Sequence, residues 1–132
     1  MNDCIFCKIA QGQIPSKKVY EDDLVYAFYD INPQAKTHVL IIPKEHISSC
    51  ADVNEKNSSV VAHIFEVIPK IAESEGLKNG FRVISNCGPD ACQSVLHLHF
   101  HLLGGEQMSE KMAYTKKRSG KCRIVFFALF AR

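Results

Sequence analysis

The sequence predicts an α+β domain whose five strands form one antiparallel sheet with one short and one long helix. Several short runs rich in β-branched and aromatic residues are separated by polar turns. One later stretch changes to the three- and four-residue spacing of an amphipathic helix. Most connections between the strand-like runs are too short for parallel crossovers, which favours antiparallel pairing.

The first elements are a short helix and a hairpin. Ile5 and Ile9 lie one turn apart, which predicts a helix over residues 4–9. The runs 17–21 and 24–30 are strand-like and are separated only by two aspartates. We therefore expect them to pair as a hairpin.

A strand over residues 37–43 should precede the long helix. Asp52 and Glu55 resemble a capping box at the start of this helix, and Gly76 could end it. Pro69 should kink or divide it. The predicted apolar face consists of Val60, Val61, Ile64, Phe65, Ile68, Ile71 and Ala72.

Two further strands, over residues 81–86 and 95–103, are joined by a turn-rich loop, residues 87–93. The second strand contains three alternating histidines, His97, His99 and His101. Strand periodicity would place all three imidazoles on one face, with leucine and phenylalanine side chains on the other. A half-buried strand whose polar face happens to be histidine is the alternative.

Three neighbouring imidazoles, each with an ordinary pKa of about 6.5, would repel one another if all were charged. Some of them must therefore remain neutral. Because neutral imidazole is both a nucleophile and a metal ligand, the segment indicates a chemical site.

Charge and hydropathy exclude two classes of protein. Residues 1–112 hold 10 basic and 14 acidic residues, so this part lacks the basic surface of a duplex nucleic-acid binder. The longest apolar run, residues 124–131, is far shorter than the roughly 20 residues of a membrane span. No secretory signal is visible, and we expect a cytoplasmic protein.

Residues 1–112 are expected to form one domain, and residues 113–132 an atypical C-terminal tail that is basic and then apolar. The tail could bind an anionic membrane surface, add a strand to a sheet edge, or be an extension that aggregates when exposed. We favour the last two and expect no membrane partner.

The order and spacing of several motifs resemble the histidine triad family, and within it the nucleotide-binding branch. The signature stands here as residues 97–103, preceded by Gln93-Ser94-Val95. Similar segments lie at residues 5–6, 20–23, 27–31, 37–44 and 46–47, and at 103–105. The resemblance covers nearly all of residues 4–108 and implies a homodimer with a ten-stranded sheet.

This resemblance implies hydrolysis of purine nucleoside 5′-phosphoramidates to a nucleoside monophosphate and an amine through a covalent nucleotidyl-histidine intermediate. Two alternatives remain open. One is a dinucleoside polyphosphate hydrolase, and the other is a nucleotide-binding or partner-binding protein with little catalysis.

The resemblance also implies roles for individual residues. His99 matches the nucleophile, and we expect a backbone carbonyl to hold its other ring nitrogen. The other matches to catalytic positions are His101, Ser94 and His38. The expected nucleotide-binding residues are Phe6, Ile14, Phe28, Asp30, Ile31, Asn86, Ser94, Val95, His99 and His101. Asp30 would bind the ribose hydroxyls, whereas His63 matches no functional position.

Cys4 and Cys7 have the spacing of a metal-binding or redox pair. Certain bacterial relatives bind zinc through such a pair and two histidines, which match His46 and His97 here. A closed Cys₂His₂ tetrahedron would be structural, with one zinc per chain and no organic cofactor. Two reduced cysteines without metal are the alternative.

Cys92 departs from the pattern because relatives usually have glycine there. If the loop needs a positive φ at this position, the side chain could narrow the site or reduce activity.

Overall fold

A computed structural model describes residues 3–112 of the chain. The tail expected at residues 113–132 lies outside the described residues. The described elements, in order, are α1 (Ile5–Ala10), β1 (Lys18–Glu21), β2 (Val25–Tyr29), β3 (Thr37–Pro43), the 3₁₀ turn η1 (Cys50–Asp52), α2 (Ser58–Ser74), β4 (Phe81–Ile84), the 3₁₀ turn η2 (Pro89–Ala91) and β5 (Phe100–Gly104).

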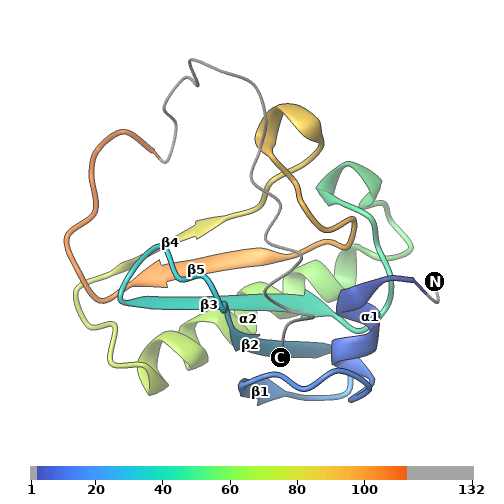
Figure 1. Ribbon diagram of the computed structural model, residues 1–132, viewed down its shortest axis with the longest axis horizontal. Helices are drawn as coiled ribbons and strands as arrows, with labels where there is room; N and C mark the ends of the chain where they lie inside the picture. Colours follow the sequence, from blue (N-terminus) through green and yellow to red (C-terminus); the bar gives the residue numbers. More distant parts are fainter. Residues whose placement is uncertain (1–2, 113–132) are drawn as a thin grey trace.

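The strands form one antiparallel sheet in the order β1-β2-β3-β5-β4 (Figure 1). Strand β3 lies in the middle, and β1 and β4 form the edges. This arrangement confirms the predicted α+β class and the five-stranded antiparallel sheet. None of the helices described is long and apolar enough to cross a membrane.

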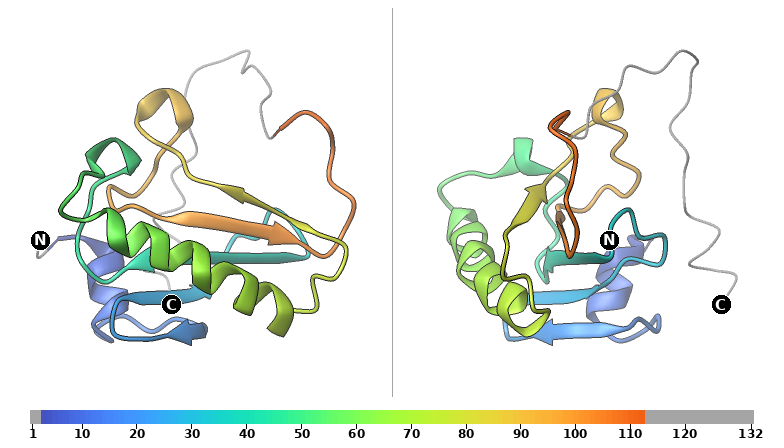
Figure 2. Two further views of the ribbon diagram at one scale, coloured as in Figure 1. Left: turned by 180° about the vertical axis from the view of Figure 1, so that it is seen from behind. Right: turned by 90° about the vertical axis from the view of Figure 1, so that its left-hand side faces the viewer.

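The two helices lie on opposite faces of the sheet (Figure 2). The apolar face of α2 packs on one face, where fully buried Ile64, Val39 and Leu102 belong to the same core. On the other face, α1 contributes Phe6 and Ile9 to a second core around β2 and β3. Each face of the sheet therefore has its own buried apolar layer.

Helix α2 differs from its prediction at its start. It begins at Ser58 after Asn57, and Asp52 belongs to η1, so the expected capping box does not form. Pro69 lies inside one uninterrupted helix. Gly76 follows the helix with a φ of +72°, a conformation that glycine adopts without steric cost.

The expected strand over residues 95–103 is also shorter than predicted. Strand β5 begins only at Phe100, so His97 and His99 lie in the connection before it and do not share a strand face with His101. The amide of His97 bonds to the carbonyl of Val95, which turns the chain outside the sheet ladder. Leu98 and Phe100 nevertheless both belong to the α2 core, and His97 and His99 between and before them are buried as well.

Candidate functional site: a histidine network beside a Cys₂His₂ cluster

The hydrogen bond of His99 fixes which of its ring nitrogens carries a proton. Its Nδ1 lies 2.6 Å from the backbone carbonyl oxygen of His97. A carbonyl can only accept, so the Nδ1–H of His99 donates to it. In the neutral ring Nε2 is then unprotonated and nucleophilic, which agrees with the expected backbone carbonyl.

A second chain of hydrogen bonds fixes His38 and His101. The backbone N–H of Gln34 donates to Nδ1 of His38 at 3.0 Å, so the proton of neutral His38 is on Nε2. That Nε2 lies 2.8 Å from Nδ1 of His101 and donates to it. Neutral His101 must then carry its proton on Nε2, where it is a hydrogen-bond donor.

The surroundings of these rings keep them neutral. Burial lowers the pKa of His99 and of His38 below the ordinary value, although the Asp30 carboxylate opposes this in both. Burial, together with the neighbouring histidines His99 and His38, lowers the pKa of His101 to about 3. His99 and His101 have ring centroids 5.1 Å apart, so an unprotonated nitrogen and an N–H donor occupy neighbouring rings.

Asp30 lies beside the histidine network. Its Oδ2 is 3.3 Å from Nε2 of His38, while its Oδ1 accepts the backbone N–H of Asn32 at 2.8 Å. The carboxylate therefore faces the histidine network with one oxygen and is held by its own turn with the other.

An apolar wall stands beside His99. The rings of Phe6 and His99 meet edge to face with centroids 5.1 Å apart, and Phe6 meets Phe28 in the same way at 5.5 Å. Val95 belongs to this core and Ile14 packs against it. The structure thus brings together Phe6, Phe28, Ile14 and Val95 from the expected nucleotide-binding residues, whereas Ile31 is exposed outside this core.

Ser94 and Asn86 are half-buried in the connection between β4 and β5. Their part in nucleotide binding stays a prediction. Strand β4 ends at Ile84, so Asn86 lies beyond the strand in which it was expected.

Three residues that support the site were missed by the sequence reasoning. Gln34 acts through its backbone amide, for which side-chain identity gives no signal. The hydroxyl of Ser85 donates to the carbonyl of His99 at 3.0 Å. The amide of Gln93 donates to the carbonyls of Ser48 and Val95, which joins two loops around the site.

The four residues expected to bind metal lie together. Side-chain atoms of Cys4, Cys7, His46 and His97 all fall within 4.8 Å of one another. The Sγ atoms of Cys4 and Cys7 are 3.3 and 3.5 Å from Nδ1 of His97, and Cys7 Sγ is 3.3 Å from Nδ1 of His46. Helix α1 supplies Cys7, and Cys4 precedes its first turn.

These distances fit a tetrahedral zinc ion. Bonds of about 2.3 Å to sulfur and about 2.0 Å to nitrogen would place such ligand atoms about 3.5 Å apart. The Nε2 of His97 lies 2.8 Å from the carbonyl oxygen of Pro43 and donates to it, which leaves Nδ1 unprotonated toward the cysteines. Burial lowers the pKa of His97 to about 4, so its ring is neutral as a ligand must be.

Cys92 has the left-handed backbone conformation that glycine favours, with a φ of 57°. The expectation of a positive φ at this position is therefore confirmed. Cys4, Cys7, Cys50 and Cys87 carry free thiols, whereas Cys92 does not.

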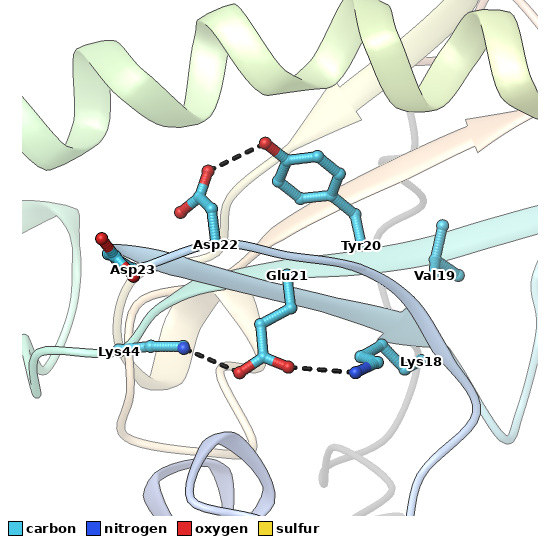
Figure 3. A pocket seen from close by; sticks show the side chains of 7 residues that line it. All are labelled: Lys18, Val19, Tyr20, Glu21, Asp22, Asp23 and Lys44. Atoms are coloured by element: carbon cyan, nitrogen blue, oxygen red, sulfur yellow. Dashed lines mark hydrogen bonds and ion pairs between the residues drawn. The ribbon is translucent and has the colours of Figure 1, made fainter.

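A pocket of about 450 Å³ lies along β1, away from the network of His38, His99 and His101, and is lined by residues 18–23 and Lys44. Its charged groups are largely paired with one another, since Glu21 bridges Lys18 and Lys44 (Figure 3). Tyr20 and Asp22 point toward α2 instead. Because none of the expected site residues lines this pocket, we do not place the functional site there.

Comparisons with known proteins agree with this fold and site. The family model described as "Scavenger mRNA decapping enzyme C-term binding" matches residues 3–117. A histidine triad protein from Clostridium difficile superposes with a TM-score of 0.81 and is 53% identical, covering 83% of this chain and 96% of its own. The chain belongs to the histidine triad family.

Two curated plant relatives are also similar. The "14 kDa zinc-binding protein" of Zea mays is 50% identical over 107 residues, which are 80% of this chain and 84% of the relative. The "Adenylylsulfatase HINT1" of Arabidopsis thaliana is 43% identical over 107 residues, which are 80% of this chain and 73% of the relative.

Proposed function

We propose that this protein is a hydrolase of purine nucleoside 5′-phosphoramidates that works through a nucleotidyl-histidine intermediate. The observation that carries the proposal is that hydrogen bonds fix which ring nitrogen is protonated in two neighbouring histidines. His99 presents an unprotonated Nε2, and His101 beside it presents an N–H. A phosphorus centre needs both groups, one to attack and one to bind the oxygens or the leaving group.

In the first half-reaction, Nε2 of His99 would attack the α-phosphorus. A P–N bond to His99 forms, the P–N bond to the amine breaks, and the amine leaves after taking up a proton from Nε2–H of His101 or from solvent. Nε2–H of His101 would hydrogen-bond to the phosphate or to the departing nitrogen. The carbonyl of His97 stabilises the positive charge that develops on the His99 ring, because Nδ1–H already donates to it.

In the second half-reaction, a water oxygen would bond to phosphorus. The P–N bond to His99 breaks, the water gives a proton to the group that protonated the amine, and the nucleoside monophosphate leaves. His99 then returns to its starting form. The same buried ring is thus nucleophile first and leaving group second, for which a neutral imidazole is suited.

The base, the ribose and the phosphate of the nucleotide would each contact a different group of residues. Phe6, Phe28, Ile14 and Val95 supply an apolar wall for the base, with Ile31 at its exposed margin. Asp30 would accept from the ribose hydroxyls, and Ser94 and Asn86 would contact the phosphate.

The Cys₂His₂ cluster would hold one zinc ion per chain, with Cys4, Cys7, His46 and His97 as its four ligands. With four protein ligands the ion's contribution is structural, because no coordination position remains for a substrate. The ligands join α1 to the segments before η1 and before β5, so they would fix the position of His97.

We also propose that two chains pair through β4 into a ten-stranded sheet. Strand β4 is one edge of the sheet, and an edge strand has backbone groups available for pairing. Phe81 on this strand is 41% exposed. The protein would then be a homodimer. We also propose that it is cytoplasmic.

The test compares turnover of adenosine 5′-phosphoramidate, diadenosine polyphosphate and adenylyl sulfate by the zinc-loaded protein. The proposal predicts the highest kcat/KM for the phosphoramidate. Preference for the polyphosphate would favour the dinucleoside polyphosphate hydrolase, and preference for the sulfate would match the Arabidopsis relative's name. Tight AMP binding without turnover of any of the three would favour a binding protein.

A further inference from the structure

Two free thiols that are far apart in the sequence meet at the end of the sheet near η1 and η2. The loop that carries Cys50 lies beside the β4–β5 connection, which carries Cys87 (Figures 1 and 2). The Sγ of Cys87 is 3.3 Å from Oγ of Ser49, and both cysteines are exposed. The side chain of Gln93 donates to the carbonyl of Ser48 at 2.8 Å and so holds the two loops together.

The surroundings of Cys87 stabilise its thiolate. Hydrogen bonding with the Ser49 hydroxyl, the Ala51 backbone amide and the Cys50 side chain lowers its pKa, while slight burial and the Asp52 carboxylate act in the opposite direction. The Ser49 hydroxyl is itself oriented, because its oxygen accepts the backbone N–H of Ala51 at 3.2 Å. A thiolate held among such donors is the attacking form of a cysteine.

The pKa of Cys50 is shifted in the opposite direction to that of Cys87. Burial and the neighbouring Cys87 raise its pKa, so the Cys50 thiol loses its proton less readily than the Cys87 thiol. Once Cys87 is bound covalently to another sulfur, its negative charge is gone and one cause of the raised pKa of Cys50 disappears. The pair is therefore asymmetric in the sense that an attacking and a resolving cysteine require.

We propose that Cys50 and Cys87 form a dithiol site that reacts with low-molecular-weight disulfides, with Cys87 as the attacking and Cys50 as the resolving cysteine. The sulfur of Cys87 bonds to one sulfur of the disulfide, whose S–S bond breaks and releases one thiolate. Cys50 then loses its proton and attacks the Cys87 sulfur, which releases the second thiolate and leaves a Cys50–Cys87 disulfide. Two protein thiols are oxidised, and one small disulfide is reduced to two thiols.

This site is separate from the proposed zinc cluster, whose cysteines lie at α1. It is also independent of the proposed hydrolysis, since neither Cys50 nor Cys87 belongs to the histidine network.

The experiment treats the zinc-loaded full chain with oxidised glutathione and maps tryptic peptides by mass spectrometry. Wild type should yield a crosslink between the peptide of residues 45–56 and that of residues 83–111. Cys50→Ser should lose this crosslink and accumulate a glutathione adduct on Cys87. Cys87→Ser should lose both the crosslink and any comparable adduct on Cys50, which also excludes a link from Cys50 to Cys92 in the same peptide.

A second measurement uses the wild-type chain alone and needs no variant. In wild type, iodoacetamide should modify Cys87 faster than Cys50 in the native chain, and the ratio should fall toward one in denaturant. Equal native rates would overturn the proposal, as would equal adducts in the two variants or no reaction of the wild type with oxidised glutathione. A crosslink that produces covalent dimers on a non-reducing gel would also contradict it, because the two sulfurs meet within one chain.

Discussion

The backbone carbonyl of His97 accepts a hydrogen bond from Nδ1 of His99 at 2.6 Å, so a member of the Cys₂His₂ cluster also sets the protonation of the proposed nucleophile. The side chain of the same His97 turns its Nδ1 toward Cys4 and Cys7. One residue therefore connects the two centres, with its side chain in one and its backbone in the other. A change in either centre should affect the other through His97.

Loss of the two cysteines should remove the metal and weaken the fold. In a Cys4→Ser/Cys7→Ser variant we expect the single zinc per chain to disappear from native mass spectra, and the melting temperature to fall. Structural zinc stabilises small domains by several kcal/mol or more, so the fall should be clearly measurable. The Cys50→Ser variant is the matched control and should keep its zinc. Metal-free wild type, purified without chelator, would show that the cluster is only a group of reduced thiols and imidazoles.

Replacement of His38 tests the second hydrogen-bond chain. Without Nε2–H of His38, nothing in the described network directs the proton of His101 to Nε2, and kcat should fall by roughly 10- to 100-fold. The His63→Ala variant, which changes a histidine on α2, should leave kcat unchanged. Equal rates for wild type and His38→Ala would mean that His101 needs no such support.

A hydrogen bond between Asp22 in the hairpin and His63 on α2 should make stability depend on pH. Burial tends to raise the pKa of Asp22, but hydrogen bonds from His63, Tyr20 and two backbone amides outweigh it and lower the pKa well below the usual range. The His63 ring nitrogen lies 2.6 Å from the carboxylate. A lowered pKa means that the ionised carboxylate stabilises the folded state above pH about 4 and that this contribution is lost as the pH falls further.

Asp22→Asn should therefore cost about 1 kcal/mol at pH 7, a modest figure because the pair is partly exposed, and the difference should shrink toward pH 3. Denaturant unfolding at the two pH values measures it. Asp23→Asn, on the adjacent residue, makes the same change in formal charge and should have little effect. A cost that stays the same at both pH values would contradict the assignment.

Removal of residues 113–132 tests the proposed domain boundary. Both apolar cores are built from residues between Ile5 and Leu102, so a chain ending at Met112 should remain folded and active. Soluble yield, melting temperature and turnover check this. Loss of any of them would show that the tail belongs to the fold.

The sequence was informative where side-chain type and spacing set the structure. Alternating and helical periodicity predicted the sheet and α2, because burial depends on side-chain position along each element. The capping box and the length of β5 were predicted wrongly, because the local turns at η1 and before His97 replaced the regular elements. Pro69 was tolerated because it lies in a helix held by tertiary packing.

In the site, too, the sequence predicted side chains with a motif but not backbone groups. The side chains that we propose as metal ligands and as nucleophile could be predicted from their motifs, and the structure places them close together. The amide of Gln34 and the carbonyl of Pro43 could not, because backbone groups carry no sequence signal. Likewise, Cys50 and Cys87 meet only through the packing of two loops.

The most direct test of the account measures release of AMP from adenosine 5′-phosphoramidate by wild type and His99→Ala side by side. His63→Ala serves as the control for removing a histidine, and zinc content is checked in all three proteins. We expect turnover by wild type and His63→Ala, and loss of turnover in His99→Ala. Turnover that persists in a folded, zinc-loaded His99→Ala protein would contradict the assignment of the nucleophile, and absence of turnover in folded wild type would contradict the proposed activity itself.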